Sequence, residues 1–418
     1  MSARTAYVGV TAAYWALMLT DGALRMLVLL HFHTLGFTPV QLAYLFLLYE
    51  FAGMVTNLFA GWIAARVGMT VTLYAGMLLQ VLALLALALL NPAWALGLSV
   101  AYVMLVQGVS GVAKDLTKMS SKSAVKLLAP KTHGGLFRWV AALTGSKNAV
   151  KGFGFLLGAA LLAVFGFKAT VLGMATILAI ILLTLFFAMP SSLPSGRKGV
   201  KFSDVFSKSA NINWLSASRL FLFGARDVWF VVGIPIYFYA VLSDGSEESR
   251  RSAFFAIGTF MALWIILYGA VQAIAPRLLR AASQPETALV GKARIWAWGL
   301  GFVPAILTLA VLVLPSAHPA LTVILVLGLL VFAVVFAVNS SLHSYLILAF
   351  SNSERVTMDV GFYYMANAGG RLLGTALSGL AFQLGGLSLL FAVATTMVCL
   401  SALAAGKLTG DPDNTAKA

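Results

Sequence analysis

The feature of this sequence that most restricts its fold is a series of long apolar runs without a charged residue. Residues 78–90, 169–189 and 321–338 contain no Asp, Glu, Lys or Arg, and they reach or approach the length of about 20 residues that a helix needs to span a bilayer. Only helices and closed barrels satisfy their backbone hydrogen bonds in lipid, and barrel strands alternate apolar and polar residues. That alternation is missing from the sequence, which therefore predicts an all-α integral membrane protein.

Composition supports the same conclusion and limits the partners. The chain is 61% hydrophobic and 10% charged, whereas soluble domains are about 45–50% apolar and about 25% charged. A net charge of +15 would suggest nucleic-acid binding in a soluble protein, but membrane proteins concentrate Lys and Arg in cytoplasmic loops. We therefore expect the lipid bilayer as a partner and no nucleic acid. The single cysteine, Cys399, excludes an intrachain disulfide and a multi-thiolate metal site.

Apolar runs between Gly, Pro and charge clusters predict about twelve transmembrane helices. A long polar connector, residues 190–210, separates two pseudo-symmetric six-helix bundles. The predicted domains are an N-terminal bundle (1–189), a cytoplasmic linker (190–210) and a C-terminal bundle with a short cytoplasmic tail (211–418). The expected helices cover residues 7–34, 39–65, 69–90, 94–127, 135–166, 169–189, 211–241, 252–275, 293–314, 320–350, 356–383 and 386–406.

Basic residues predict the orientation of the chain. Loops on the side of the linker carry Arg66, Lys131 and Arg277, while the opposite loops near Pro39 and Pro315 carry almost none. Because Lys and Arg mark the cytoplasmic side, we expect the linker and both termini in the cytoplasm. The N-terminus lacks a signal-peptide cleavage pattern and is expected to be a retained first helix.

Two features of the chain resemble the major facilitator superfamily of transporters. Residues 155–161 (FLLGAAL) and 371–377 (RLLGTAL) repeat at equivalent places of the two predicted halves. The loop after the second predicted helix keeps Gly61, Arg66 and Gly68 of that superfamily's signature but has Ala65 in place of an aspartate. The resemblance covers essentially the whole chain. It implies substrate binding between the halves, in a cavity lined by the first, fourth, seventh and tenth helices with the fifth and eleventh beside them.

Cations inside predicted spans are functional candidates, because an intramembrane charge costs about 2.5–3.5 kcal/mol on insertion scales. Several converge on the implied cavity, where only an anion would compensate their desolvation, and Arg can bind a phosphate-like group bidentately. We therefore predict a multiply charged oxyanion as substrate. Arg219 is another intramembrane cation of the seventh helix. The predicted substrate-binding residues are Arg25, Lys114, Lys118, Lys147, Lys151, Arg226 and Arg371, with Asn148 and Asn367 beside them.

Four intramembrane acids, Asp21, Glu50, Asp115 and Asp227, are candidates for proton coupling, since a carboxyl in apolar surroundings can take up and release protons. An alternative is that they only form ion pairs. Asp21 precedes Arg25 by four residues on one helical face, Asp227 adjoins Arg226, and Asp115 lies among the lysines of its helix. The residue pattern leaves both interpretations open.

Three segments resemble the organoarsenical efflux permeases called ArsJ: residues 21–33, 111–120 and 143–152. The resemblance implies export of 1-arseno-3-phosphoglycerate, the adduct that glyceraldehyde-3-phosphate dehydrogenase forms when it uses arsenate in place of phosphate. It also implies arsenate resistance, a bacterial inner-membrane location and a functional link to that dehydrogenase. Proton antiport would drive the export.

Two other function classes make different predictions about the residues. A drug or sugar efflux protein of the same fold would carry acids rather than bases around its pocket, unless the lysines pair with Asp115 and snorkel outward. A membrane-embedded enzyme would need paired catalytic groups near one membrane face, and the sequence offers no persuasive set. We therefore predict no enzyme activity, no catalytic residue, no metal site and no cofactor.

Overall fold

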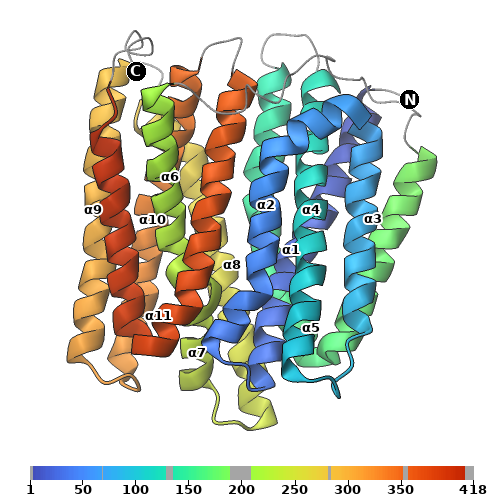
Figure 1. Cartoon of the computed structure of the whole chain (residues 1–418), viewed down its shortest axis with the longest axis vertical. Helices are drawn as coiled ribbons and strands as arrows, with labels where there is room; N and C mark the ends of the chain where they lie inside the picture. The colour runs from blue at the N-terminus through green and yellow to red at the C-terminus, as the bar shows by residue number, and fades with distance from the viewer. Residues whose placement is uncertain are drawn as a thin grey trace.

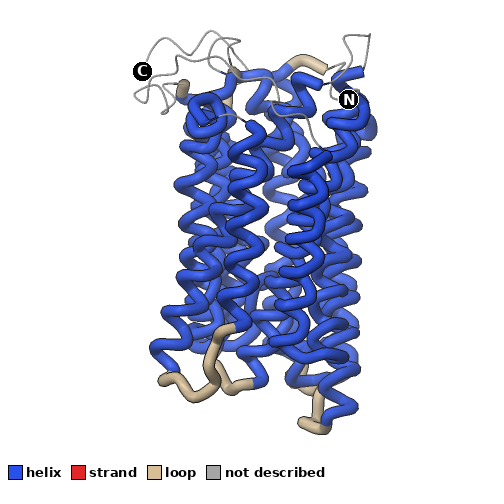
Figure 2. Tube along the Cα trace, turned by 90° about the vertical axis from the view of Figure 1, so that its right-hand side faces the viewer, coloured by secondary structure: helices blue, strands red, loops and turns tan. Residues whose placement is uncertain are grey.

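The computed structural model describes residues 3–67, 69–128, 135–188, 209–280, 284–351 and 356–409. The helices of this part run side by side along the long axis of the molecule (Figure 1), and a view turned by 90° shows helices joined by loops (Figure 2). Their bounds are α1 Ala3–Thr34, α2 Pro39–Val67, α3 Met69–Ala88, α4 Leu96–Leu128, α5 Gly135–Ala188, α6 Ala210–Val228, η2 Trp229–Gly233, α7 Ile234–Leu242, α8 Glu247–Leu278, α9 Glu286–Val313, α10 Pro319–Phe350 and α11 Val356–Gly406.

The described residues contain ten helices that are long and apolar enough to cross a membrane, where α6, η2 and α7 count as one continuous span. The expectation of a multi-pass membrane protein is therefore confirmed. Two of the ten, α5 with 54 residues and α11 with 51, are much longer than the others. A straight helix of about 50 residues would be about 75 Å long, while the hydrocarbon core of a bilayer is about 30 Å thick.

Glycines interrupt both of these long helices. Gly166 in α5 has a φ of 74°, and Gly386 in α11 has a φ of 58°, a region that glycine enters without the steric cost that other residues meet. The hydroxyl of Thr170 donates to the carbonyl oxygens of Leu161 at 3.0 Å and Gly166 at 2.6 Å. These hydrogen bonds connect the part of α5 after Gly166 with the part before it. The breaks lie where the sequence predicts boundaries between helices. In Figure 1 the chain of α5 reverses its direction at the end of the bundle where its label stands.

The repeated sequence motif has a counterpart in helix packing. A Cβ atom on Gly158 of α5 would lie 2.1 Å from the carbonyl oxygen of Ala23 in α1, and one on Gly374 of α11 would lie 2.5 Å from that of Gly224 in α6. Each glycine therefore lets two backbones approach closely. The two similar motifs thus make similar contacts, one between α1 and α5 and one between α6 and α11.

Helices from the first part of the chain, before residue 189, pack against helices from the second part, after residue 208. α2 lies against α11, and α5 lies against α8. Large apolar side chains on the outside, such as Phe187, Leu89 and Val313, are mostly exposed, as expected for surfaces that face lipid. Many polar and charged side chains of the spans, among them Glu50, Asp115 and Arg219, are buried inside the bundle instead.

Candidate functional site

A cavity of about 460 Å³ lies inside the bundle. α1, α2, α4 and α5 supply one part of its wall, and α6, η2, α8, α10 and α11 supply the rest. The structure places all nine predicted substrate-binding residues on this wall, although they come from five different helices. These nine are Arg25, Lys114, Lys118, Lys147, Lys151, Arg226, Arg371, Asn148 and Asn367.

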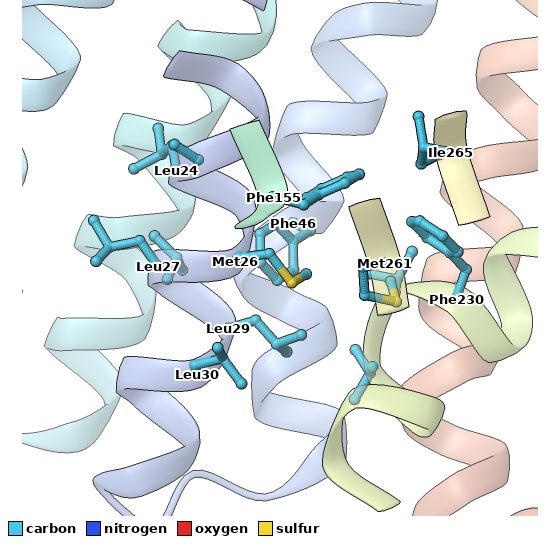
Figure 3. Packing of buried hydrophobic residues seen from close by; sticks show 14 of the residues in the cluster. Leu24, Met26, Leu27, Leu29, Leu30, Phe46, Phe155, Phe230, Met261 and Ile265 are labelled. Carbon is cyan, nitrogen blue, oxygen red and sulfur yellow. The ribbon is translucent and has the colours of Figure 1, made fainter. Parts of the chain in front are cut away.

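A buried apolar stretch of α1 follows the part of this helix that lines the cavity. Of the α1 side chains that the structure describes, Tyr14, Met18 and Arg25 line the cavity, whereas the following stretch Leu27–Leu30 is at most 1% exposed. Figure 3 shows Leu27 and Leu29 of α1 among the buried hydrophobic residues of one cluster, which also contains Phe46 and Met261. At the other end, toward the start of α1, Lys147, Asn148 and Gln272 on the wall are partly exposed. The partly exposed residues of the wall therefore include three that lie toward the end of the bundle at which α1 begins.

Positive charge exceeds negative charge around the cavity. Two carboxylates, Glu50 and Asp115, line it, and two more, Asp21 and Asp227, lie behind it in ion pairs with residues of the wall. Among the residues that the structure describes, eight cations and four carboxylates give a formal charge of 8 − 4 = +4 at the cavity. The cations are Arg25, Lys114, Lys118, Lys147, Lys151, Arg219, Arg226 and Arg371.

A chain of alternating charges crosses one wall. Glu50 of α2 is paired with Arg25 of α1, and the same Oε1 accepts from Nη2 of Arg371 at 2.6 Å. Nε of Arg371 in α11 lies 3.3 Å from Oδ2 of Asp227, which is also paired with Arg226 of α6. Glu50 is only 1% exposed and Asp227 is fully buried. Arg371 therefore connects the acid of α2 with the acid of α6 through charge-assisted hydrogen bonds.

The partner of Asp21 differs from the one that sequence spacing suggests. Asp21 accepts from Nζ of Lys151 in α5 at 2.7 Å and from the hydroxyl of Tyr49, while Arg25 pairs with Glu50. An ion pair between Asp21 and Arg25 is therefore the wrong interpretation. The i, i+4 rule applies to helix surfaces in water, and here contacts with α2 and α5 decide the pairing.

Asp115 forms ion pairs with two lysines of α4, as expected if the intramembrane acids pair with nearby cations. Its Oδ1 lies 3.0 Å from Nζ of Lys118, and its Oδ2 lies 3.7 Å from Nζ of Lys114. Lys118 also donates to Oδ1 of Asn57 at 2.8 Å, and the ammonium of Lys114 lies 4.1 Å from the ring centroid of Tyr49. One carboxylate therefore neutralises at most one of the two ammonium groups.

Arg219 is not among the nine residues predicted from the sequence. Its Nε donates to Oδ1 of Asn367 at 2.9 Å, and its Nη1 donates to the carbonyl oxygen and hydroxyl of Ser340 at 3.1 and 2.9 Å. Nε2 of Gln272 donates to the same hydroxyl at 3.1 Å, and Gln272 accepts from Asn148 at 3.3 Å. Arg219 lies seven residues before Arg226, on one face of the helix, and this spacing is the signal that could have selected it.

Aromatic rings form another part of the wall, which the sequence does not predict. The aromatic lining residues are Tyr14, Phe155, Phe223, Phe230, Tyr268 and Tyr364. Rings interact favourably with nearby cations. Their positions could not be read from the sequence, because aromatic residues are also common in the lipid-facing and core positions of any membrane helix.

Two predicted features lie partly or wholly outside the described residues. Gly68 is not described, and neither are the side chains in the range that holds Gly61 and Arg66, so the loop signature stays a prediction. The linker 190–210 is described only from residue 209 onward. In the described part of the chain no group of three or more His, Cys, Asp or Glu residues is placed to hold a metal ion.

Solved structures of transporters share this fold over almost the full chain. An inward-open xylose transporter XylE from E. coli matches with a TM-score of 0.69 at 12% identity, covering 97% of this chain and 96% of its own. A POT family transporter in complex with 5-aminolevulinic acid matches with a TM-score of 0.73 at 15% identity, covering 96% and 95%. An inward-facing bacterial homologue of the iron transporter ferroportin matches with a TM-score of 0.68 at 16% identity, covering both chains completely.

No protein-family model and no curated sequence matches the chain. Identities this low establish the fold alone, which this chain shares with these transporters. The predicted all-α membrane architecture is confirmed, while twelve helices in two six-helix bundles stay a prediction. A shared fold does not define a substrate, so the function has to be argued from the cavity.

Proposed function

We propose that this protein is a transporter that exports a multiply charged oxyanion by alternating access. The observation that carries the proposal is the formal excess of four positive charges around the buried cavity. Buried cations are costly unless they are paired, and an anion entering the cavity would supply the missing negative charge. A cationic drug would add to the repulsion, and a neutral sugar would leave it unchanged.

The division of charge between the two parts of the chain fits a substrate with an anionic group at each end. Residues before the linker contribute five cations and three carboxylates, 5 − 3 = +2, and residues after it contribute three cations and one carboxylate, 3 − 1 = +2. 1-Arseno-3-phosphoglycerate has this form, with an acyl arsenate group at one end and a phosphate ester at the other. Pentavalent arsenate mimics phosphate, and Arg and Lys suit both groups.

The resemblance to organoarsenical efflux permeases supports the choice of this substrate. Its three segments, 21–33, 111–120 and 143–152, contain five of the eight cavity cations. The proposed biological role is arsenate resistance, with glyceraldehyde-3-phosphate dehydrogenase producing the substrate in the same bacterial cell. The proposed location is the inner membrane.

The proposed topology follows the sequence. Dividing α5 and α11 at their glycine breaks gives twelve crossings from the ten apolar helices. We place the termini and the linker 190–210 in the cytoplasm, so that the bundles 1–189 and 211–418 enclose a cavity that faces inward here. Proton antiport would use Asp21, Glu50, Asp115 or Asp227, each of which holds a cation that the substrate would also attract.

Everted membrane vesicles test this proposal, because their cytoplasmic face is outward. The unstable adduct is generated outside them by glyceraldehyde-3-phosphate dehydrogenase from glyceraldehyde 3-phosphate, NAD and arsenate, and arsenic retained in the vesicles is measured. Uptake is expected only when the dehydrogenase is present, and 3-phosphoglycerate should compete. Omitting the enzyme measures any uptake of arsenate itself.

Variants connect uptake to the cavity. Lys114→Ala, Lys147→Ala and Arg226→Ala should each reduce uptake, because they remove charge from the wall. Lys292→Ala is the matched control, since the ammonium of Lys292 donates to the carbonyl oxygen of Leu279 outside the cavity. Uptake that is absent from the wild type, or that these three cavity variants leave unchanged, would overturn the proposal.

One observation favours a second candidate, a sugar transporter. Asn148, Gln272 and Asn367 are neutral amides on the cavity wall, and amides suit hydroxyl groups. A xylose transporter also has this fold. Competition separates the candidates, because phosphate esters should inhibit an oxyanion exporter and free sugars should inhibit a sugar transporter.

A further inference from the structure

Arg219 differs from the other cavity arginines in its surroundings. Arg25, Arg226 and Arg371 each share a carboxylate. Arg219 forms no ion pair with a described residue, and the acceptors of its hydrogen bonds are an amide, a hydroxyl and a backbone carbonyl. It is nevertheless only 4% exposed. A guanidinium does not lose its proton in proteins, so this buried charge persists without a counter-ion from the described part of the chain.

The guanidinium contacts two aromatic rings and two hydrogen-bond partners, and no described residue accepts from one of its nitrogens. Its Cζ lies 4.0 Å from the ring centroid of Phe223 and 5.1 Å from that of Tyr363. An arginine has five N–H donors, and the hydrogen bonds to Asn367 and Ser340 use Nε and Nη1. No described residue accepts from Nη2. Arg219 lines the cavity, so its free donors can meet a ligand there.

Neutral donors gather next to this guanidinium. The hydroxyl of Ser340 accepts from Arg219 and from Nε2 of Gln272, and it lies 3.3 Å from the hydroxyl of Tyr268. Gln272 and Tyr268 also line the cavity. A cation whose hydrogen-bond partners are neutral polar groups is suited to a compact anion, because the anion gains charge-assisted hydrogen bonds without displacing a carboxylate.

The lysines of α4 present the opposite situation. Lys114 and Lys118 share Asp115, and Lys118 also donates to Asn57. An anion that approaches these ammonium groups must compete with Asp115 and is repelled by it. Their contribution to affinity should therefore be smaller than that of Arg219, although they carry the same formal charge.

We propose that Arg219 is the principal anchor for the phosphoryl group of the substrate, and that the lysines paired with Asp115 receive the second anionic group. This inference rests on the proposed function and assigns the two ends of the substrate to the two sides of the cavity. It makes Arg219, rather than any of the nine residues predicted from the sequence, the main determinant of affinity for phosphate esters.

Binding to the purified full chain in lipid nanodiscs tests the assignment with three stable probes. 3-Phosphoglycerate carries a phosphoryl group and a carboxylate, glycerol 3-phosphate carries the phosphoryl group alone, and glycerate carries the carboxylate alone. Arg219→Gln should weaken both phosphate esters by about ten- to a hundredfold, the range for hydrogen bonds to a charged group, and should leave glycerate unchanged. Lys118→Gln should weaken 3-phosphoglycerate severalfold and leave glycerol 3-phosphate unchanged.

Two further variants separate binding from folding. Arg219→Lys keeps the charge but loses the planar donor set that binds a phosphate bidentately. Its affinity for the esters should therefore be lower than that of the wild type and higher than that of Arg219→Gln. If Arg219→Gln does not fold, the comparison of Arg219→Lys with the wild type still tests the assignment. Arg294→Gln is the matched structural control, because Arg294 donates to the backbone carbonyls of Ala405 and Leu408 outside the cavity. It should bind all probes like the wild type.

The outcomes distinguish this inference from the proposed function. If the wild type binds none of the three probes and 3-phosphoglycerate does not inhibit uptake, the proposed function is wrong. If the wild type binds the esters and the Arg219 variants bind them equally well, the proposed function stands and the role of Arg219 is refuted. An equal loss of esters and glycerate in Arg219→Lys would likewise refute the assignment of the phosphoryl end.

Discussion

Replacing Glu50 by glutamine tests the charge chain that joins α2 to α11. Glu50 is 1% exposed and accepts from Arg25 and, at 2.6 Å, from Arg371. The substitution keeps the size of the side chain and removes its charge. Arg25 then has no carboxylate partner among the described residues, while Arg371 keeps Asp227 at 3.3 Å.

The expected loss of stability follows from this geometry. Removing one partner of a buried ion pair costs about 3–5 kcal/mol, because the other charge is left buried and unpaired. Two features favour the lower end of that range: Arg371 retains its second carboxylate, and its side chain is 17% exposed. We therefore expect Glu50→Gln to lower the free energy of unfolding by about 3 kcal/mol, measured by denaturant titration of the purified chain in detergent.

An exposed ion pair of the same protein provides the control. Glu247 and Arg251 lie 2.8 Å apart with side chains that are 66% and 56% exposed, and such surface pairs contribute about 0–1 kcal/mol. Glu247→Gln should therefore have a small effect. If Glu50→Gln costs no more than Glu247→Gln, the reasoning about the charge chain is wrong.

A double-mutant cycle isolates the contact between Glu50 and Arg371. Combined with Arg371→Gln, the Glu50→Gln substitution should cost clearly less than the sum of the two single changes, since residues in one network do not act additively. Strictly additive costs would mean that the contact contributes nothing to stability.

Two smaller predictions concern packing and pH. Gly158→Ala should destabilise the protein by about 1–3 kcal/mol, because the new Cβ would lie 2.1 Å from the carbonyl oxygen of Ala23, whereas Gly173→Ala in the same helix meets no atom within 4 Å and should leave thermal stability unchanged or slightly raised. Hydrogen bonds from the Ser249 hydroxyl and the Ser246 N–H lower the pKa of exposed Asp244 to about 2. The carboxylate of Asp244 therefore becomes protonated only as the pH falls through that value. Asp244→Asn should therefore not shift the pH profile of transport above about pH 5, and a shifted midpoint would contradict this.

The sequence alone predicts the elements of this fold well, because each rests on local composition. The apolar runs identify the spans, and the glycines near residues 166 and 386 mark the places where two long helices break. The intramembrane cations stand out because charge in lipid is costly. Their gathering at one cavity was predicted through a resemblance to transporters, and the structure brings them there.

Partner choice could not be predicted, because it depends on how each helix is rotated in the bundle. Glu50 has no basic residue within four positions on its own helix, and its partners Arg25 and Arg371 are 25 and 321 positions away. Asp21 pairs with Lys151, 130 positions away, instead of the nearby Arg25. Local spacing describes only neighbours on one helix, whereas these pairs form between helices.

The four carboxylates of the cavity explain how so many cations can be buried before a substrate arrives. Eight unpaired cations would repel one another strongly in a low dielectric, and Asp21, Glu50, Asp115 and Asp227 reduce that repulsion. The charge that remains among the described residues is positive. On the proposed function, the same carboxylates keep the affinity moderate, because a substrate that binds must share the cations with them. A transporter benefits from this balance, since a ligand that is bound too tightly on one side of the membrane is not released on the other.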